Sequence, residues 1–385
     1  MANESLHKAK TAKNDEFYTR LTDVAEELRH YKKHFRGKTV LCNCDDPTWS
    51  AFWKYFHLNF EELDLKKIIS THYDIEKPTY KMEYTGGDDD NIESGVKTPL
   101  EGNGDFRSQE CLDLLSECDI VVTNPPFSIA RESYVPLLFK YKKKFIIIGD
   151  LNWVTYKFIF PLLKENKMWM GCSNVKAFIQ PDGSIKKFGN KLWYTNLDIK
   201  KRHENIILWK KYSSDSYHKY DNYDAINVDK VSEIPCDYCE SWKVTEEELL
   251  KLNSLDWEIV REQNECSIKI LWIIPASGTE LRKILSQHSN GYKEKIEEKL
   301  KKCLTSDDEK TTLLQWTADR YCNGIFGVPI TFFGVHNSKQ FEIIGATESE
   351  GKGFSQGLWI SESEVAQPLV ESKRKYKRLF TRKIL

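Results

Sequence analysis

The turn Asn124-Pro125-Pro126-Phe127 contains the residues of this chain with the clearest chemical meaning, and it directly follows an apolar run at residues 120–122. The amide oxygen of Asn124 and the carbonyl oxygen of Pro125 can both accept hydrogen bonds from one planar amine. Two successive prolines fix the backbone in an extended conformation, which holds both oxygens in place. Phe127 offers an aromatic face on which a flat ring can stack.

This arrangement suits the methylation of an exocyclic amine such as that of adenine. The lone pair of that amine is delocalised into the ring, so its attack on a methyl donor needs acceptors that draw the N–H bonds out of the ring plane. Acceptors held ready for a developing positive charge stabilise the transition state electrostatically. We therefore predict that residues 124–127 are catalytic, the alternative being an ordinary turn that closes a buried strand.

The elements that must position this turn alternate between helix and strand. Strands are expected at residues 39–41, 67–71, 119–122 and 144–150, and helices at residues 21–35, 46–56 and 109–118. Such alternation predicts an α/β fold, with a doubly wound, Rossmann-like sheet covered by helices on both faces. A hairpin signal at residues 181–183 and a further strand at residues 191–194 predict antiparallel pairing at one end of the sheet.

The alternation fades beyond residue 212, which predicts two regions. Residues 1–212 are expected to form the catalytic domain, and residues 213–385 a target-recognition region. Residues 239–322 differ in composition from their surroundings and predict an inserted, mainly helical subdomain. One of its helices should open at Thr245, and a long charged one should cover residues 292–304.

The loop after the first strand should hold a cofactor, because ligands of doubly wound sheets bind at the carboxyl ends of the strands. Residues 42–47 contain no glycine, which disfavours the phosphates of NAD or ATP. S-adenosylmethionine has no phosphate, and Asp45 can pair with its ammonium while the helix N-terminus near Thr48 receives its carboxylate. We predict that this loop binds S-adenosylmethionine through Asn43, Asp45, Asp46 and Pro47, although Asp46 and Pro47 also fit a plain helix start.

Two further positions are predicted to contact the same cofactor. Asp74, just past the second strand, is placed to accept hydrogen bonds from the ribose hydroxyls, although it also fits a simple loop acid. Asp105 and Phe106 are placed to bind the adenine amine and to stack on the adenine ring. The acidic run at residues 88–90 is interpreted as solvated, because three adjacent carboxylates point in different directions and do not form a metal site.

Composition limits the class of protein. With 385 residues, 40% of them hydrophobic, the chain can bury a large core, and no apolar run reaches the ~18 residues that a membrane span needs. The ten cysteines lack a secretory context, so we expect reduced thiols and a cytoplasmic protein. Cys236 and Cys239 have metal-ligand spacing, but no second pair stands at a matching distance, and no metal is predicted.

Charge distribution, rather than net charge, indicates a polyanionic partner. Lysine and arginine number 57 against 58 acidic residues, so the net charge is close to zero. Two basic runs, at residues 200–203 and 373–383, are interleaved with or adjacent to aromatic residues, as in a surface that contacts phosphates. The partner expected on this basis carries phosphates; the alternative for each run is a solvated charged face.

Five motifs together resemble the adenine-specific DNA methyltransferases of the EcoRI modification type: residues 15–19, 42–47, 124–128, 193–197 and 327–332. The resemblance covers residues 13–238 and 323–385, and the stretch 239–322 interrupts it. It implies that Phe17, Tyr18 and Thr19 close over the methyl donor. It also implies that Trp193 and Tyr194 line the pocket for the target base.

The resemblance implies double-stranded DNA as the partner, with transfer of a methyl group from S-adenosylmethionine to the N6 amine of adenine after base flipping. We expect the base to lie between Phe127 and Tyr194, in a monomer with no membrane association. A restriction-modification system with a cognate endonuclease is one setting, and an orphan modification enzyme is another. Methylation of RNA or of a protein glutamine, and a catalytically silent DNA-binding protein, are the other hypotheses.

Overall fold

The computed structural model of the chain describes residues 18–44, 46–74, 78–180, 182–236, 238, 257–264, 267–275, 324–347, 354–355, 358 and 367–384. The chain forms two compact units. Unit 1 comprises residues 1–204, 330–336 and 348–354, and unit 2 comprises the rest. Each unit is described by itself.

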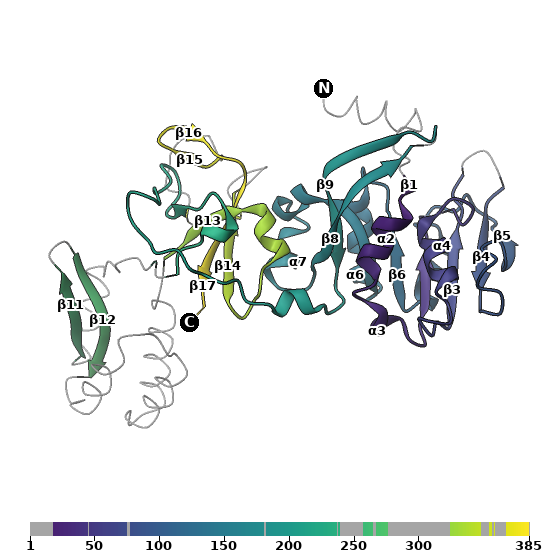
Figure 1. Cartoon of the computed structure of the whole chain (residues 1–385), viewed down its shortest axis with the longest axis horizontal. Coiled ribbons are helices and arrows are strands. Elements are labelled where there is room, and N and C mark those ends of the chain that lie inside the picture. Colours follow the sequence, from purple (N-terminus) through teal and green to yellow (C-terminus); the bar gives the residue numbers. More distant parts are fainter. Residues whose placement is uncertain are drawn as a thin grey trace. The chain divides into compact units, whose positions relative to one another are not determined.

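A large mixed sheet forms the centre of unit 1 (Figure 1). In the described residues its strand order is β1-β8-β9-β7-β6-β2-β3-β4-β5. The strands are β1 (Tyr18–Thr19), β2 (Thr39–Cys42), β3 (Lys67–Thr71), β4 (Tyr80–Tyr84), β5 (Val96–Pro99), β6 (Ile120–Thr123), β7 (Lys144–Asp150), β8 (Trp169–Ile179) and β9 (Ile185–Thr195). The predicted mixed α/β architecture is therefore confirmed.

The middle of this sheet is parallel and determines where a ligand can bind. Strand β2 pairs in parallel with β3 on one side and with β6 on the other, and β6 pairs in parallel with β7. Both β2 and β6 are buried along their whole length. The connections therefore reverse direction between β2 and β6, so the loops that follow these two strands lie beside each other at the carboxyl edge.

The helices of unit 1 are short. They are α2 (Leu21–Leu28), α3 (Lys32–Phe35), α4 (Ala51–Leu58), α5 (Gln109–Glu117), α6 (Val135–Lys140) and α7 (Phe160–Lys164), with single turns η1 (Ala130–Tyr134), η2 (Leu151–Thr155) and η3 (Lys200–His203). The single helix predicted at residues 21–35 is divided into α2 and α3. Aromatic side chains of α4, including Phe52, Trp53 and Phe56, lie in the main hydrophobic core.

The predicted start of α4 at Asp46 and Pro47 is wrong. The helix begins at Ala51, and the hydroxyl of Ser50 accepts hydrogen bonds from the amides of Phe52 and Trp53 at 3.1 and 3.2 Å. The carboxylate of Asp46 instead accepts from the Thr48 amide at 2.9 Å, closing a turn upstream of the helix. Both Asp and Ser satisfy exposed amides in this way, so composition alone did not decide between them.

The β8–β9 hairpin is long (Figure 1), and its pairing shows that it extends beyond its neighbour β7. Asp150, the last residue of β7, pairs with Lys191, which in turn pairs with Val175. Residues 176–187 of the hairpin therefore continue past the carboxyl end of β7. The hairpin predicted around residues 181–183 is confirmed, and the strand predicted at residues 191–194 is the second half of β9.

A buried carboxylate fixes the irregular part of β8. Glu27 of α2 is fully buried and accepts hydrogen bonds from the Tyr31 hydroxyl at 2.7 Å, the Cys172 amide at 2.8 Å and the Ser173 amide at 2.7 Å. These amides lie between Met170 and Asn174, where the pairing of β8 with β9 shifts register. Glu27 thus satisfies donors that the sheet leaves unpaired.

We expect Glu27→Leu to lower the free energy of unfolding by about 3–5 kcal/mol, because several buried donors lose their acceptor at once. Chemical denaturation of the full chain measures this change. The matched control is Glu26→Leu. The carboxylate of Glu26 forms an exposed ion pair with Lys176 at 3.1 Å, and its loss should lower the free energy of unfolding by less than about 1 kcal/mol. Equal losses for the two variants would contradict the role of Glu27.

Unit 2 contains a smaller sheet. Its order in the described residues is β10-β13-β17-β14, made of β10 (Ile226–Asn227), β13 (Phe326–Pro329), β17 (Arg378–Lys383) and β14 (Phe341–Ala346). Two separate hairpins consist of β11 (Trp257–Asn264) with β12 (Ser267–Pro275), and β15 (Leu369–Val370) with β16 (Lys373–Arg374). Two short turns, η4 (Val231–Glu233) and η5 (Ile330–Gly334), complete the elements, and η5 belongs to unit 1.

The region at residues 239–322 was predicted to be mainly helical. Its described residues are the strands β11 and β12, which form an antiparallel hairpin. The helices predicted at Thr245 and at residues 292–304 lie outside the described residues. Among the helices that are described, none is long and apolar enough to cross a bilayer.

Candidate active site

The predicted catalytic turn lies at the carboxyl end of β6. Asn124 and Phe127 are half-buried, and Pro125 is buried. The carbonyl of Pro126 accepts hydrogen bonds from the amides of Ile129 and Ala130 at 3.2 and 3.0 Å, which leads the chain into the turn η1. The turn is thus held at both ends, by a buried strand before it and by backbone hydrogen bonds after it.

The β8–β9 hairpin packs against the aromatic residue of this turn. The rings of Phe127 and Phe178 lie edge to face, with centroids 5.8 Å apart, and Phe178 packs in the same way on Phe188 at 5.4 Å. The ammonium of Lys191 lies 4.0 Å from the centroid of the Phe127 ring. Phe127 therefore sits among residues of the hairpin and is not simply an exposed platform.

A hydrogen bond joins the loop after β2 to the segment after β6. The hydroxyl of Tyr134, in η1, donates to the side-chain oxygen of Asn43, and both residues are almost completely buried. The ring of Phe106 packs edge to face on Tyr134, with centroids 4.9 Å apart. Two predicted cofactor residues, Asn43 and Phe106, are therefore brought together, and Tyr134 is a member of this cluster that the sequence did not indicate.

Asp46 shapes the loop after β2. One of its oxygens accepts from the Thr48 amide and from the Tyr80 hydroxyl at 3.0 Å, and the other lies 2.9 Å from Nδ1 of His72. Burial, followed by the nearby Asp46 carboxylate, raises the pKa of Tyr80 to about 12. Pro47 is buried. Asp46 and Pro47 therefore fix the conformation of the loop, and any contact of Asp46 with a cofactor would compete with these partners.

The loops that carry Asp74 and Asp105 lie side by side. The Asp74 amide donates to the carbonyl of Asn103 at 3.2 Å, and a Cβ on Gly104 would lie 2.2 Å from the carbonyl oxygen of His72. Asp105 forms an ion pair with Arg107 at 2.5 Å, and hydrogen bonds from that guanidinium lower the pKa of Asp105. Both predicted carboxylates thus lie beyond the carboxyl end of β3, as the fold requires.

Three buried polar atoms near this edge have no hydrogen-bond partner among the described residues. They are the side-chain nitrogen of Asn43 and the hydroxyls of Thr71 and Thr19. Thr71 ends β3, and Thr19 lies in β1, whose Tyr18 ring stacks on Trp49 near the start of α4. Buried polar groups are almost always satisfied, so these atoms fit a bound polar ligand. Their donors and acceptors suit the hydroxyl and amino groups of S-adenosylmethionine.

Two predicted cofactor residues, Phe17 and Asp45, lie outside the described residues. Their neighbours Tyr18, Thr19, Cys44 and Asp46 are described. The assignments of Phe17 and Asp45 stay predictions.

The two residues predicted to line a base pocket are fully buried. Trp193 and Tyr194 are adjacent in β9, so their side chains lie on opposite faces of the sheet. Trp193 packs edge to face on Phe52, whereas Tyr194 stacks on Trp153 at 5.3 Å and donates to the carbonyl of Asp150 at 3.0 Å. One base cannot contact both side chains, and each of them is already packed inside the protein, so the pocket assignment stays a prediction for both residues.

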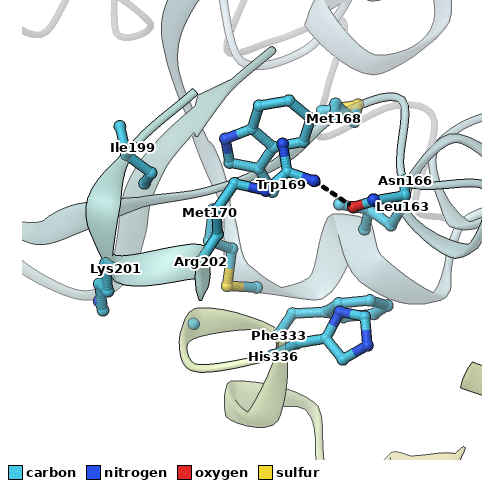
Figure 2. Close-up of a pocket in the computed structure, with 11 residues that line it drawn as sticks. Leu163, Asn166, Met168, Trp169, Met170, Ile199, Lys201, Arg202, Phe333 and His336 are labelled. Atoms are coloured by element: carbon cyan, nitrogen blue, oxygen red, sulfur yellow. Dashed lines mark hydrogen bonds between the residues drawn. The ribbon is translucent and has the colours of Figure 1, made fainter. Parts of the chain in front are cut away.

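The basic run at residues 200–203 lines a separate hollow of unit 1, at the start of β8 (Figure 2). The guanidinium of Arg202 lies 3.5 Å from the ring centroid of Trp169 and donates to Asn166 at 2.7 Å. Lys201 donates to the carbonyl of Cys172 at 3.1 Å. Lys201 and Arg202 therefore bind groups of the protein itself, which leaves less of this run available to phosphates than the sequence suggested.

The second basic run is also partly internal. Arg378 is almost completely buried and forms an ion pair with Asp229 at 2.9 Å, and Arg382 pairs with Glu342 at 2.6 Å. These residues belong to β17, an inner strand of the unit 2 sheet. In contrast, Lys373 and Arg374 of β16 are exposed. Only part of the run is therefore available to phosphates.

Comparison with known proteins identifies the family. Residues 5–322 match the family model for the adenine-specific methyltransferase EcoRI. The matched range spans residues 239–322, which were predicted to interrupt the resemblance, so the inserted subdomain stays a prediction. The motif at residues 327–332 lies beyond the match. No solved structure matches the chain.

Three curated relatives are similar to the chain. The Type II methyltransferase M.EcoRI of Escherichia coli is 43% identical over 291 residues, which cover 67% of this chain and 89% of that protein. M.MpnI of Mycoplasma pneumoniae is 37% identical over 60% of this chain and 77% of its own length, and M.MgeORF184P of Mycoplasma genitalium is 36% identical over 60% and 78%. The chain therefore belongs to the EcoRI family of adenine-specific methyltransferases.

Proposed function

We propose that this enzyme transfers a methyl group from S-adenosylmethionine to the N6 amine of adenine in double-stranded DNA. The observation that carries the proposal is the hydrogen bond between Tyr134 and Asn43. It joins the segment after the catalytic turn to the predicted donor loop, at the point where the sheet connections reverse. The donor and the target amine can therefore meet there.

The proposed donor site lies at the carboxyl ends of β2 and β3. S-adenosylmethionine supplies a methyl group activated by a positively charged sulfur. The side-chain nitrogen of Asn43 and the hydroxyl of Thr71 would satisfy its polar groups, and Asp74 would accept from the ribose hydroxyls. Asp105 would accept from the adenine amine if its pairing with Arg107 leaves one lone pair available. Thr19 would close the site from β1.

The chain's own groups would act on the target amine. The side-chain oxygen of Asn124 and the carbonyl of Pro125 would accept its two hydrogens, which localises the lone pair on nitrogen for attack. The base must leave the helical stack to reach these oxygens, at a cost of a few kcal/mol. We propose that residues 213–385 form the target-recognition region, with Lys373 and Arg374 among its phosphate contacts.

Methyl transfer from labelled S-adenosylmethionine to DNA tests this function directly. We expect label in adenine of duplex DNA and none in RNA or in glutamine-containing peptides. Modified-base sequencing of DNA from cells that express the chain would then give the recognition sequence. Label only in RNA or peptide would establish one of the other methyltransferase hypotheses, and DNA binding without transfer would indicate a silent protein.

The Type II names of the relatives support a place in a restriction-modification system. An enzyme of that kind would methylate the same sequence that a cognate endonuclease cuts. DNA methylated by this chain should then resist such a nuclease, whereas unmethylated DNA of the same sequence should be cut.

We expect Tyr134→Phe to weaken binding of S-adenosylmethionine by about tenfold, because Asn43 loses the donor that orients its side chain. Isothermal titration calorimetry of the full chain measures this affinity. Tyr141→Phe is the matched control, since it removes the same hydroxyl at the end of α6 and should leave the affinity unchanged. An unchanged affinity for Tyr134→Phe would count against the donor site.

A further inference from the structure

An ion pair between buried Lys191 and half-buried Asp150 lies against the proposed catalytic turn, at the carboxyl end of β7. The ammonium of Lys191 is 3.1 Å from Oδ2 of Asp150. The same ammonium lies 4.0 Å from the centroid of the Phe127 ring, and Lys191 is only 9% exposed. Lysine is rarely buried without a partner, so this placement needs an explanation beyond packing.

Asp150 is itself held in one position. Its Oδ1 accepts from the Asn152 amide at 2.8 Å, which caps the turn η2. Its Oδ2 accepts from the side chain of Asn190 at 2.7 Å as well as from Lys191. The carboxylate therefore has little freedom, and through it the ammonium of Lys191 is fixed above the ring of Phe127.

A cation over an aromatic face attracts the ring and restricts its tilt. Lys191 covers one face of Phe127, while Phe178 packs on the ring edge to face. Together they hold the plane of the ring before any base arrives. A base that stacks on Phe127 would then find the ring already oriented, which lowers the entropy lost on binding.

The charge of Lys191 also needs its partner. The target amine becomes positively charged as it attacks the methyl group, so a lone ammonium one ring away would oppose the reaction. Asp150 cancels this charge at 3.1 Å. The pair therefore supplies the cation that orients the ring without leaving net positive charge beside the reacting nitrogen.

We propose that Asp150 and Lys191 form a positioning pair, which orients Phe127 for stacking of the target adenine and keeps the surroundings of its amine electrically neutral. The proposal rests on the proposed methylation of adenine. It assigns a role to two residues that neither the sequence motifs nor the family match identified. Neither residue contacts the reacting atoms, so both act through Phe127.

Four variants test the pair: Lys191→Met, Lys191→Arg, Asp150→Asn and the double variant Asp150→Asn with Lys191→Met. Lys191→Met should lower kcat by about tenfold or more with KM for S-adenosylmethionine unchanged, and Lys191→Arg should keep most of the activity. Asp150→Asn should be the most impaired, since it leaves the cation uncompensated. The double variant should recover activity relative to Asp150→Asn, because it removes that cation.

The control is Lys176→Met, which removes an exposed lysine of the same hairpin and should leave kcat unchanged. The proposal is overturned if Lys191→Met keeps wild-type kcat, if arginine restores nothing, or if the double variant is worse than Asp150→Asn. If Lys191→Met does not fold, the proposal is tested by comparing kcat of Lys191→Arg with kcat of Asp150→Asn. Equal values for these two variants overturn the proposal. An inactive wild-type chain would instead refute the proposed function.

Discussion

Asn124→Ala is expected to lower kcat for methyl transfer by roughly 100-fold or more, while the affinity for S-adenosylmethionine stays within about twofold. The side-chain oxygen of Asn124 is one of only two acceptors proposed for the target amine. Without it, the lone pair of the amine stays more delocalised into the base, and only the carbonyl of Pro125 compensates the positive charge that develops on nitrogen. The expected loss therefore lies in the chemical step and not in binding.

Single-turnover transfer of a labelled methyl group to DNA measures this step, and calorimetry measures donor binding. The matched control is Asn166→Ala, which removes the same amide from the separate hollow beside Arg202. That variant should retain the rate of the wild type. A near wild-type rate for Asn124→Ala would remove the catalytic turn from the mechanism, and a parallel loss of donor affinity would make Asn124 a binding residue.

The second large effect concerns the fold of unit 2. Removal of residues 378–385 should abolish its cooperative unfolding, because β17 lies between β13 and β14 and pairs with both. Leu379 and Phe380 of this strand are fully buried, so their loss also opens the core of the sheet. Thermal unfolding and limited proteolysis measure the result, with cleavage expected throughout unit 2.

A charge-reversal variant separates this structural effect from phosphate binding. Lys373→Glu with Arg374→Glu changes two exposed residues of β16 and should leave the unfolding transition unchanged. It should weaken DNA binding and reduce the slope of log affinity against log salt by about one to two. A shortened chain that still unfolds cooperatively would contradict the place of β17, and an unchanged salt slope would contradict the phosphate contacts.

Much of the parallel core could be predicted from the sequence. Strands β2, β3, β6 and β7 are short apolar runs, buried on both faces, and each is bounded by turn or cap residues. The proposed catalytic turn was singled out because prolines, an amide and an aromatic residue follow one of these runs directly. Both signals are local in the sequence.

The missed elements depend on tertiary context. Strand β5 is mostly exposed and polar, so it lacks the alternation that indicates a strand, and no strand was predicted at its position. The basic run at residues 373–383 was interpreted as a surface, although Arg378 is buried by pairing with Asp229, a residue far away in the sequence. The distribution of charges along a sequence does not show which basic residues will form ion pairs inside the folded protein.

The missed site residues have the same origin. Tyr134 and Lys191 are chemically ordinary in the sequence, and their proposed roles rest on contacts with Asn43 and with Phe127. Thr71 carried a weak signal, since it ends a buried strand at the ligand-binding edge.

The inner place of β17 also affects the order in which the protein can mature during synthesis. The strands of the unit 1 sheet have all left the ribosome once Thr195 has emerged, whereas β13 and β14 must wait for β17 before they can join. Domains generally fold as units while translation proceeds. A nascent chain would thus acquire its chemical centre well before its proposed DNA-reading part, which would limit methylation by unfinished enzyme.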